Sequence, residues 1–378
     1  MPDAVHAVPV RSGDAARPLE RRTGTLPRLL AAASTVAVLA ALAACSNGGP
    51  GPSRSTPGDV TVGPSVGVQK QAAPTATVPA RWPLTGVAGA VANRPALAVK
   101  IENSREARPQ TGLDQADMVW EEVVEGGITR FAAVFDSQVP AEVGPVRSVR
   151  PMDSTILAPM HGLIAFSGGQ PGFVQMLSDA GLQLFSQDRG APGFARKPGV
   201  APAPHNVYGT PATWWSNADA QHQAPPAPQF VIARQASAAS AVVGGTPVGA
   251  VRITMSGYSQ PSWTWDAASG TWLRSEGSAP AVVRSGARLA ATNVVVLRVT
   301  LRDTGTRDPA GNPVPETVLT GSGEALVATG GKTVPGTWTK GDKPDVLKLT
   351  GADGQPLSLA PGSTWIEMVP TNGSVTAG

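Results

Sequence analysis

The sequence predicts an α+β protein, with an N-terminal α/β-type domain containing a mixed sheet and a mainly-β domain after it. Between residues 81 and 228, apolar segments of strand length alternate with segments of helical periodicity. From residue 229 to 371, short strand-like segments separated by glycine-containing turns favour a sandwich or a barrel. Charged residues make up 15% and aromatic residues 5% of the 378 residues, which excludes a coiled coil and a charge-driven disordered chain.

The first 44 residues have the pattern of a lipoprotein signal peptide. Residues 29–44 form an apolar run without charge behind an arginine-rich stretch, and this run is shorter than the roughly 20 residues of a membrane-spanning helix. The run is followed at once by Cys45, the only cysteine of the chain. We expect cleavage before Cys45 and diacylation of its thiol. Two acyl chains would then anchor the protein to the extracytoplasmic face of the bacterial cell membrane.

Residues 45–80 combine the expected acylated cysteine with a flexible tether. Of the 35 residues after Cys45, 20 are glycine, proline, serine or threonine, so few bulky apolar side chains remain to form a core. Beyond the signal peptide the chain has 25 basic and 24 acidic residues. This near-neutral balance lacks the basic surface typical of nucleic-acid binding, and no nucleic-acid partner is predicted.

The elements expected in the first domain, residues 81–228, follow from short apolar runs and the residues that end them. Phe173, Met176 and Leu177 recur at helical spacing before Gly181, which favours a helix that stops there. Strands are predicted at residues 97–101, 118–124, 131–135 and 163–166, and helices at 154–161, 173–180 and 213–220.

The second domain, residues 229–371, is expected to contain strands almost exclusively. It holds five of the nine tryptophans, which we interpret as core residues rather than as a platform for sugars. Residues 372–378 are expected to form a tail. Strands are predicted at residues 230–234, 248–255, 263–265, 272–274, 293–301, 316–319, 325–329, 338–340, 346–349 and 365–369.

Most residues that could carry chemistry lie between residues 102 and 150. In a strand, Glu121 and Glu125 would point to one face with Val123 between them. Two such carboxylates near arginines can divide acid and base roles, but the same groups can bind a ligand or neutralise one another in structural ion pairs. The candidate catalytic residues are Glu121, Glu125 and His205, and the candidate ligand-binding residues are Glu102, Asn103, Arg108, Arg130, Arg147, Arg150 and Asn206.

Two further features of the sequence are weaker indications of function. His205 follows Pro204 in a stiff segment that would hold an imidazole in place as a proton carrier, or only as a loop anchor. A glycine-rich turn at residues 167–172 joins a predicted strand to a predicted helix, where backbone N–H groups can bind an anion or form a plain tight turn. No spacing of histidines and carboxylates predicts a metal site, and no cofactor is expected.

Ten short segments of this chain resemble segments that occur together in other proteins. The run from Glu125 to Phe131 is the most specific; the others are residues 101–103, 107–113, 116–117, 144–148, 168–169, 203–206, 293–296, 336–340 and 361–366. Together they resemble the bacterial YerB-like lipoprotein family, whose two halves are domains of unknown function. The resemblance spans about residues 82–370. It implies an exported lipoprotein with two linked domains, and no established reaction.

We therefore expect a membrane-anchored lipoprotein that binds a cell-wall component or an envelope partner in a cleft of the first domain. Arginines in that cleft would hold carboxylate or phosphate groups, while the acids and Asn103 would orient amides or hydroxyls. One alternative is a cell-wall hydrolase using Glu121 or Glu125, with His205 as proton carrier. Another is a scaffold for envelope assembly, which would present an exposed apolar patch. Whether the protein is an enzyme stays open.

Overall fold

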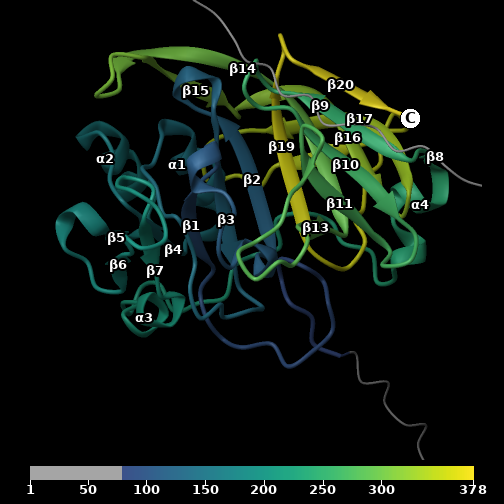
Figure 1. The fold of residues 1–378 in the computed structure, drawn as a ribbon. Coiled ribbons are helices and arrows are strands. Elements are labelled where there is room, and N and C mark those ends of the chain that lie inside the picture. Colours follow the sequence, from purple (N-terminus) through teal and green to yellow (C-terminus); the bar gives the residue numbers. More distant parts are fainter. Residues whose placement is uncertain (1–78) are drawn as a thin grey trace, which may run out of the picture. The chain divides into compact units, whose positions relative to one another are not determined.

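The computed structural model describes residues 79–378. The predicted signal peptide, Cys45 and the tether up to residue 78 lie outside the described residues. The described part contains a large mixed sheet, a smaller antiparallel sheet, a two-stranded ribbon and several short helices (Figure 1). The predicted α+β fold class is confirmed. Within residues 79–378, no helix combines the length and the apolar character that crossing a membrane requires.

The main sheet has twelve strands. They are β1 (Leu97–Glu102), β2 (Met118–Val123), β3 (Thr129–Phe135), β4 (Leu163–Phe166), β5 (Gln183–Ser186), β8 (Thr246–Pro247), β14 (Asn293–Arg307), β15 (Pro313–Val318), β16 (Gly321–Thr329), β17 (Lys332–Lys340), β18 (Lys348–Thr350) and β19 (Thr364–Pro370). Their order is β18-β17-β16-β14-β19-β2-β3-β1-β4-β5, with β15 on β14 and β8 on β17.

One parallel pairing joins the two halves of the chain within this sheet. β19 runs beside β2, from Thr364 opposite Met118 to Glu367 opposite Glu121. The sheet therefore continues across the domain boundary expected near residue 228, and residues from both halves meet on its two faces.

The smaller sheet, called the second sheet below, comes from the second half of the chain. Its strands are β9 (Ala250–Thr254), β10 (Pro261–Asp266), β11 (Thr271–Glu276), β12 (Ala279–Pro280), β13 (Ala290–Ala291) and β20 (Ser374–Ala377). The order is β12-β11-β10-β9-β20, with β13 on β11. β20 lies in the segment expected to be a tail, where backbone pairing with β9 orders it. The two-stranded ribbon is formed by β6 (Phe194–Arg196) and β7 (Val207–Gly209).

The faces of the main sheet are covered differently. Helices α1 (Pro151–Leu157) and α2 (Pro171–Asp179) place Met152 and Leu177 in one core with Trp120 of β2. On the opposite face, the second sheet, the β6–β7 ribbon and α3 (Pro211–Ser216) enclose another core that includes Phe131 and Trp365. The remaining helix is α4 (Ser240–Gly244), and the short 3-10 turns are η1 (Arg105–Ala107), η2 (Leu113–Gln115), η3 (Glu125–Gly127), η4 (Ala158–Met160), η5 (Gln187–Arg189) and η6 (Ala236–Ala238).

Several predicted elements differ from the observed ones: the helix expected at residues 213–220 ends at Ser216, and the strands expected at 338–340 and 346–349 are Lys332–Lys340 and Lys348–Thr350. The helix expected at residues 154–161 begins at Pro151, because proline suits the first helical position and the Asp153 carboxylate accepts the Arg150 backbone N–H over 2.7 Å. The strand expected at 230–234 is wrong: only Ile232 forms a bridge, to Leu359. Four of the five tryptophans in the second half are buried, which confirms their interpretation as core residues for Trp263, Trp272, Trp338 and Trp365.

Candidate functional site

The main sheet separates the predicted site residues into two groups. Arg130 lies directly opposite Glu102 of β1 and opposite Glu122 of β2, so these side chains share the face covered by α1 and α2, which we call the helix face. Glu121 precedes Glu122 by one residue and points to the other face, toward the second sheet. We call this the second-sheet face.

A buried lysine organises the centre of the helix face. Lys100 of β1 donates a hydrogen bond to Glu122 and, over 2.7 Å, another to Asp153 of α1. Burial, together with the Asp153 carboxylate, raises the pKa of Glu122 to about 7, although Lys100 favours the charged form. All three side chains are inaccessible to solvent. This group therefore fastens α1 to the sheet and offers no atom to a ligand.

Glu125 also lies on the helix face, so the expectation that Glu121 and Glu125 share a face is wrong. β2 ends at Val123, and Glu125 opens the turn η3, in which Gly126 has a positive φ of 66°. The strand alternation therefore does not extend to Glu125. Arg150 binds both oxygens of Glu125, with Nη2 2.6 Å from Oε2, and an Arg130 nitrogen lies 3.9 Å from the same oxygen.

Glu102 forms a third group at the end of β1. His205 Nδ1 lies 2.9 Å from Glu102 Oε1, and Arg147 Nε lies 3.2 Å from Oε2. The His205 and Arg147 side chains are 20% and 22% exposed, so this group reaches the surface. Asn206 does not join it: its side chain is buried and accepts a 3.0 Å hydrogen bond from Arg196 of the β6–β7 ribbon.

A buried arginine dominates the second-sheet face. Arg274 of β11 contacts Glu121 and Glu367 of the main sheet, each over 2.7 Å, and Glu276 of its own strand over 2.8 Å. The side chains of Arg274, Glu121 and Glu367 are inaccessible to solvent. Burial and the adjacent Glu121 carboxylate raise the pKa of Glu367 well above its usual range, while the Trp263 indole N–H donates to it over 2.7 Å.

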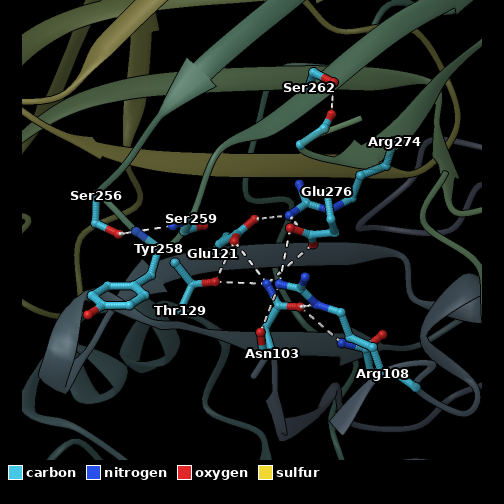
Figure 2. Close-up of polar contacts among 12 residues, drawn as sticks. Asn103, Arg108, Glu121, Thr129, Ser256, Tyr258, Ser259, Ser262, Arg274 and Glu276 are labelled. Atoms are coloured by element: carbon cyan, nitrogen blue, oxygen red, sulfur yellow. Dashed lines mark hydrogen bonds and ion pairs between the residues drawn. The ribbon is translucent and has the colours of Figure 1, made fainter. Parts of the chain in front are cut away.

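Asn103 and Arg108 connect this buried network to the surface. The Asn103 amide donates to Thr129 over 2.8 Å and to Glu121 over 3.2 Å. Arg108 donates through Nε to the Asn103 side-chain oxygen and through Nη2 to its backbone oxygen, both over 2.9 Å. The same Nη2 lies 3.1 Å from Glu276, and Figure 2 shows Glu276 between Arg108 and Arg274. Arg108 is 27% exposed, so it forms the solvent end of this chain of contacts.

Two hollows meet at Arg105 and Arg108. The larger, the arginine groove, has a volume of about 450 Å³ and is lined by Arg105, Arg108, Pro109, Gln110, Glu276, Ala279, Pro280, Ala281, Val282 and Leu289. The smaller, the Tyr258 pocket, has a volume of about 260 Å³ and is lined by Asn103, Ser104, Arg105, Glu106, Arg108, Ile128, Thr129, Tyr258 and Ser259. Figure 2 shows the Tyr258 ring on the opposite side of Asn103 from Arg108. The volume of the arginine groove is in the range of small-ligand sites, and its lining combines charged and polar side chains with apolar ones.

The glycine-rich turn at residues 167–172 is buried at Ser167 and Gly168 and exposed at Gly169, Pro171 and Gly172. Gln170 donates to the Arg307 backbone oxygen over 2.9 Å, and the Gly168 backbone oxygen accepts the Val149 N–H over 3.0 Å. A side chain at Gly168 would overlap the Asp188 carboxylate. Close packing thus explains the glycine at position 168. In the part of the chain that the structure describes, no three or more histidines, cysteines or carboxylates are grouped as metal ligands.

The comparisons with known proteins identify the family. Residues 84–224 match the family model described as "Protein of unknown function (DUF3048) N-terminal domain", and residues 251–366 match "Protein of unknown function (DUF3048) C-terminal domain". The chain belongs to the DUF3048 family. The resemblance to YerB-like lipoproteins seen in the sequence is thereby confirmed.

Two comparisons connect this DUF3048 chain to one relative. It is 39% identical over 143 residues to the "Putative lipoprotein YerB" of Bacillus subtilis (strain 168), a match that covers 37% of this chain and 43% of the relative. Its fold matches the crystal structure of the YerB protein from Bacillus subtilis with a TM-score of 0.66 at 25% identity, over 79% of this chain and 99% of that chain.

Several residues of the candidate site in this DUF3048 chain are not among the candidates predicted from the sequence. Arg274 and Glu276 lie on the same face of β11 as the buried Trp272, and a charged residue on the inward face of a strand is the signal that could have indicated them. Arg105, at the start of η1, and Tyr258, in a bend after β9, are exposed residues for which the sequence contains no comparable signal. Of the predicted ligand-binding residues, Asn103 and Arg108 line the two hollows.

Proposed function

We propose that this chain is a lipid-anchored protein of the bacterial cell envelope that binds an envelope component in the arginine groove. The anchor is supported by Cys45, which directly follows the apolar run at residues 29–44, and by the lipoprotein name of the relative. Acylation of Cys45 would hold the folded part at the extracytoplasmic face of the membrane, within reach of the cell wall and of other envelope proteins.

The binding role is supported mainly by the contacts and the partial exposure of the Arg108 side chain. Its guanidinium is fixed by Asn103 and Glu276 at the junction of two hollows, yet it keeps 27% of its side chain exposed. Burial lowers the pKa of Arg108 while Glu276 raises it, and the guanidinium stays charged. A positioned, partly desolvated arginine offers directed N–H donors to a carboxylate or phosphate group, and loses little side-chain entropy when the ligand binds.

The geometry favours binding over hydrolysis by Glu121 and Glu125. Glycoside hydrolysis requires two carboxyl groups that face one substrate from either side of the scissile bond. Here the two groups lie on opposite faces of the main sheet, and each contacts a buried arginine. One observation supports a hydrolase instead: His205 is oriented by Glu102 through Nδ1 and is partly exposed, an arrangement suited to a general base.

Co-sedimentation with isolated cell-wall sacculi tests both functions at once. The sample is the chain from Cys45 onward with Cys45→Ser, which prevents acylation, and the supernatant is analysed by mass spectrometry. We expect pelleting without released fragments. Released fragments that disappear in His205→Asn would establish the hydrolase, and a protein that neither pellets nor releases fragments would contradict wall binding.

Two variants connect the result to the groove. Arg105→Ala removes an exposed guanidinium that has no ion-pair partner within residues 79–378, and Arg108→Ala removes the fixed one. Each is expected to weaken pelleting about tenfold. Arg302→Ala is the matched control, because its 65% exposed side chain pairs with Glu316 on the β14–β15 ribbon and does not line either hollow. Equal pelleting of all three variants would exclude the groove as the site.

A further inference from the structure

The arginine groove has two more arginines at its rim, and they come from a different part of the chain. Arg284 Nη2 lies 3.3 Å from the backbone oxygen of Pro109 and 3.3 Å from the Tyr208 hydroxyl. Arg288 Nη1 donates over 2.9 Å to the backbone oxygen of Ala281. Pro109 and Ala281 both line the groove, so each of these guanidiniums is held against a residue of its wall, although neither arginine is itself part of the lining.

Among the four arginines around the groove, only Arg108 forms an ion pair within residues 79–378. Arg105, Arg284 and Arg288 have no salt-bridge partner in the part of the chain that the structure describes. Glu276, the acidic residue of the groove lining, is shared between Arg108 and the buried Arg274. The exposed Glu106 lies near Arg105 but lines the Tyr258 pocket.

This excess of positive charge is local. Outside the predicted signal peptide the chain has 25 basic and 24 acidic residues, so its overall charge would not concentrate anions anywhere. Four arginines around one groove outnumber the one carboxylate of its lining, Glu276, and therefore make the groove locally positive.

We infer that the groove binds a linear polyanion, a chain with at least two phosphate or carboxylate groups joined by aliphatic linkers. This inference rests on the proposed envelope-binding function and names its ligand class. Arginines at two separate places on the rim suit separate anionic groups, each of which accepts two N–H bonds from a planar guanidinium. Between them the wall is apolar, formed by Ala279, Pro280, Ala281, Val282 and Leu289, which suits uncharged linkers.

The lining also argues against a nucleic acid as the polyanion. Proteins that bind single strands stack bases on aromatic side chains. No tryptophan, tyrosine or phenylalanine is part of the groove lining. The groove thus offers guanidiniums for charge and small aliphatic surfaces for the linkers, but no platform for a base.

The test is a titration of the chain from Cys45 onward, with Cys45→Ser, against three probes at several NaCl concentrations. The probes are short-chain polyphosphate, poly-glutamate and inorganic phosphate, and a single-stranded DNA oligonucleotide of similar charge is the control. We expect binding of a polyanion at least tenfold tighter than of inorganic phosphate, because two anchored groups act together. Polyphosphate and poly-glutamate then show which anionic group the groove prefers.

The decisive variant is Arg284→Ala with Arg288→Ala. It should weaken polyanion binding about a hundredfold, at about tenfold for each charged contact, and lower the slope of log Kd against log salt by about two. The matched control is Arg234→Ala with Arg252→Ala, which removes two exposed arginines that do not line the groove.

Three outcomes would overturn the inference: no binding of either polyanion, equal binding of the DNA oligonucleotide, or equal weakening by the control pair. If sacculi still pellet the protein in any of these cases, the proposed function stands and only the ligand class is wrong. If sacculi no longer pellet the protein either, both the proposed function and the inferred ligand class are wrong.

Discussion

Arg274 Nη2 lies 2.7 Å from Oε2 of Glu121, and this contact joins β11 of the second sheet to β2 of the main sheet. Neither side chain is accessible to solvent. Glu121 belongs to the segment that matches the N-terminal family domain and Arg274 to the segment that matches the C-terminal one. A buried ion pair therefore connects the two segments that match the family models, next to the candidate ligand site, and its integrity should control both stability and the position of Glu276.

Arg274→Met should destabilise the protein by about 3–5 kcal/mol, because it leaves the Glu121 carboxylate buried without its positive partner. The free energy of unfolding is measured by urea denaturation followed by circular dichroism. Arg302→Met is the control: this arginine is 65% exposed, and its pair with Glu316 should contribute no more than about 1 kcal/mol. Similar losses in the two variants would mean that the Arg274 network contributes nothing beyond a surface ion pair.

The sequence predicted most of the strands because their signal is local. Apolar runs such as those at residues 97–101 and 163–166 become β1 and β4 with nearly the predicted bounds. The pairing of β19 with β2 could not be predicted, because it joins segments far apart in the chain and leaves no mark on either one. That pairing is nevertheless what places Glu367 beside Glu121, where the two carboxyl groups meet Arg274.

The sequence predicted several residues of the candidate site but not how these residues are arranged in space. The sequence identified Asn103, Arg108 and Glu121 as members of one charged cluster. The predicted strand at residues 118–124 already ended before Glu125, but placing Glu121 and Glu125 on one face extended the strand alternation into the turn η3, where Gly126 has a positive φ of 66°. The partners Arg274 and Glu276 lie in the other half of the chain, so no spacing within residues 102–150 could indicate them.

The buried carboxyl group of Asp136 should make the protein less stable at high pH. Both of its carboxylate oxygens are buried without a hydrogen-bond partner, and burial, together with the neighbouring Asp117, raises its pKa to about 7. The pKa in the unfolded chain is about 3.9, so the folded state holds this proton more tightly. The free energy of unfolding should therefore fall as pH rises from about 4 to about 7, and stay low above that.

Asp136→Asn, which resembles the protonated side chain, should change stability little at pH 4 and increase it by on the order of 2 kcal/mol at pH 8. Thermal unfolding at the two pH values measures the difference. Asp266→Asn serves as the control, because Asp266 has a lowered pKa caused by hydrogen bonds from Ser269 and should not stabilise the protein at high pH when replaced. An Asp136→Asn effect that is the same at both pH values would contradict the role assigned to its ionisation.

Glu125→Gln should destabilise the protein by about 3 kcal/mol, because Arg150 loses its bidentate carboxylate in a site where it is only 7% exposed. Glu142→Gln is a suitable control: Glu142 pairs with Lys197 at the surface, with side chains 29% and 40% exposed, and should contribute at most about 1 kcal/mol. Urea unfolding compares the two. If Glu125→Gln left the stability unchanged, Glu125 would not be a structural partner of Arg150. It would then again be a candidate for a functional carboxylate.

The last prediction concerns the packing of the β6–β7 ribbon against α3. A side-chain carbon added at Gly209 would overlap the Trp214 ring, which is fully buried in the core under the ribbon. Gly209→Ala should therefore cost about 1–3 kcal/mol or more through overpacking. Gly172 in α2 is the opposite case, because nothing lies within 4 Å of the added carbon and alanine favours a helix.

Gly172→Ala should stabilise the protein by about 0.5–1 kcal/mol, so the same substitution should act with opposite sign at the two positions. Differential scanning calorimetry of both variants checks this directly, with a lower Tm expected for Gly209→Ala and a higher one for Gly172→Ala. If Gly209→Ala were as stable as the parent, the ribbon could move away from Trp214. The loop of residues 197–206 that carries His205 to Glu102 would then not be held by tight packing beneath it.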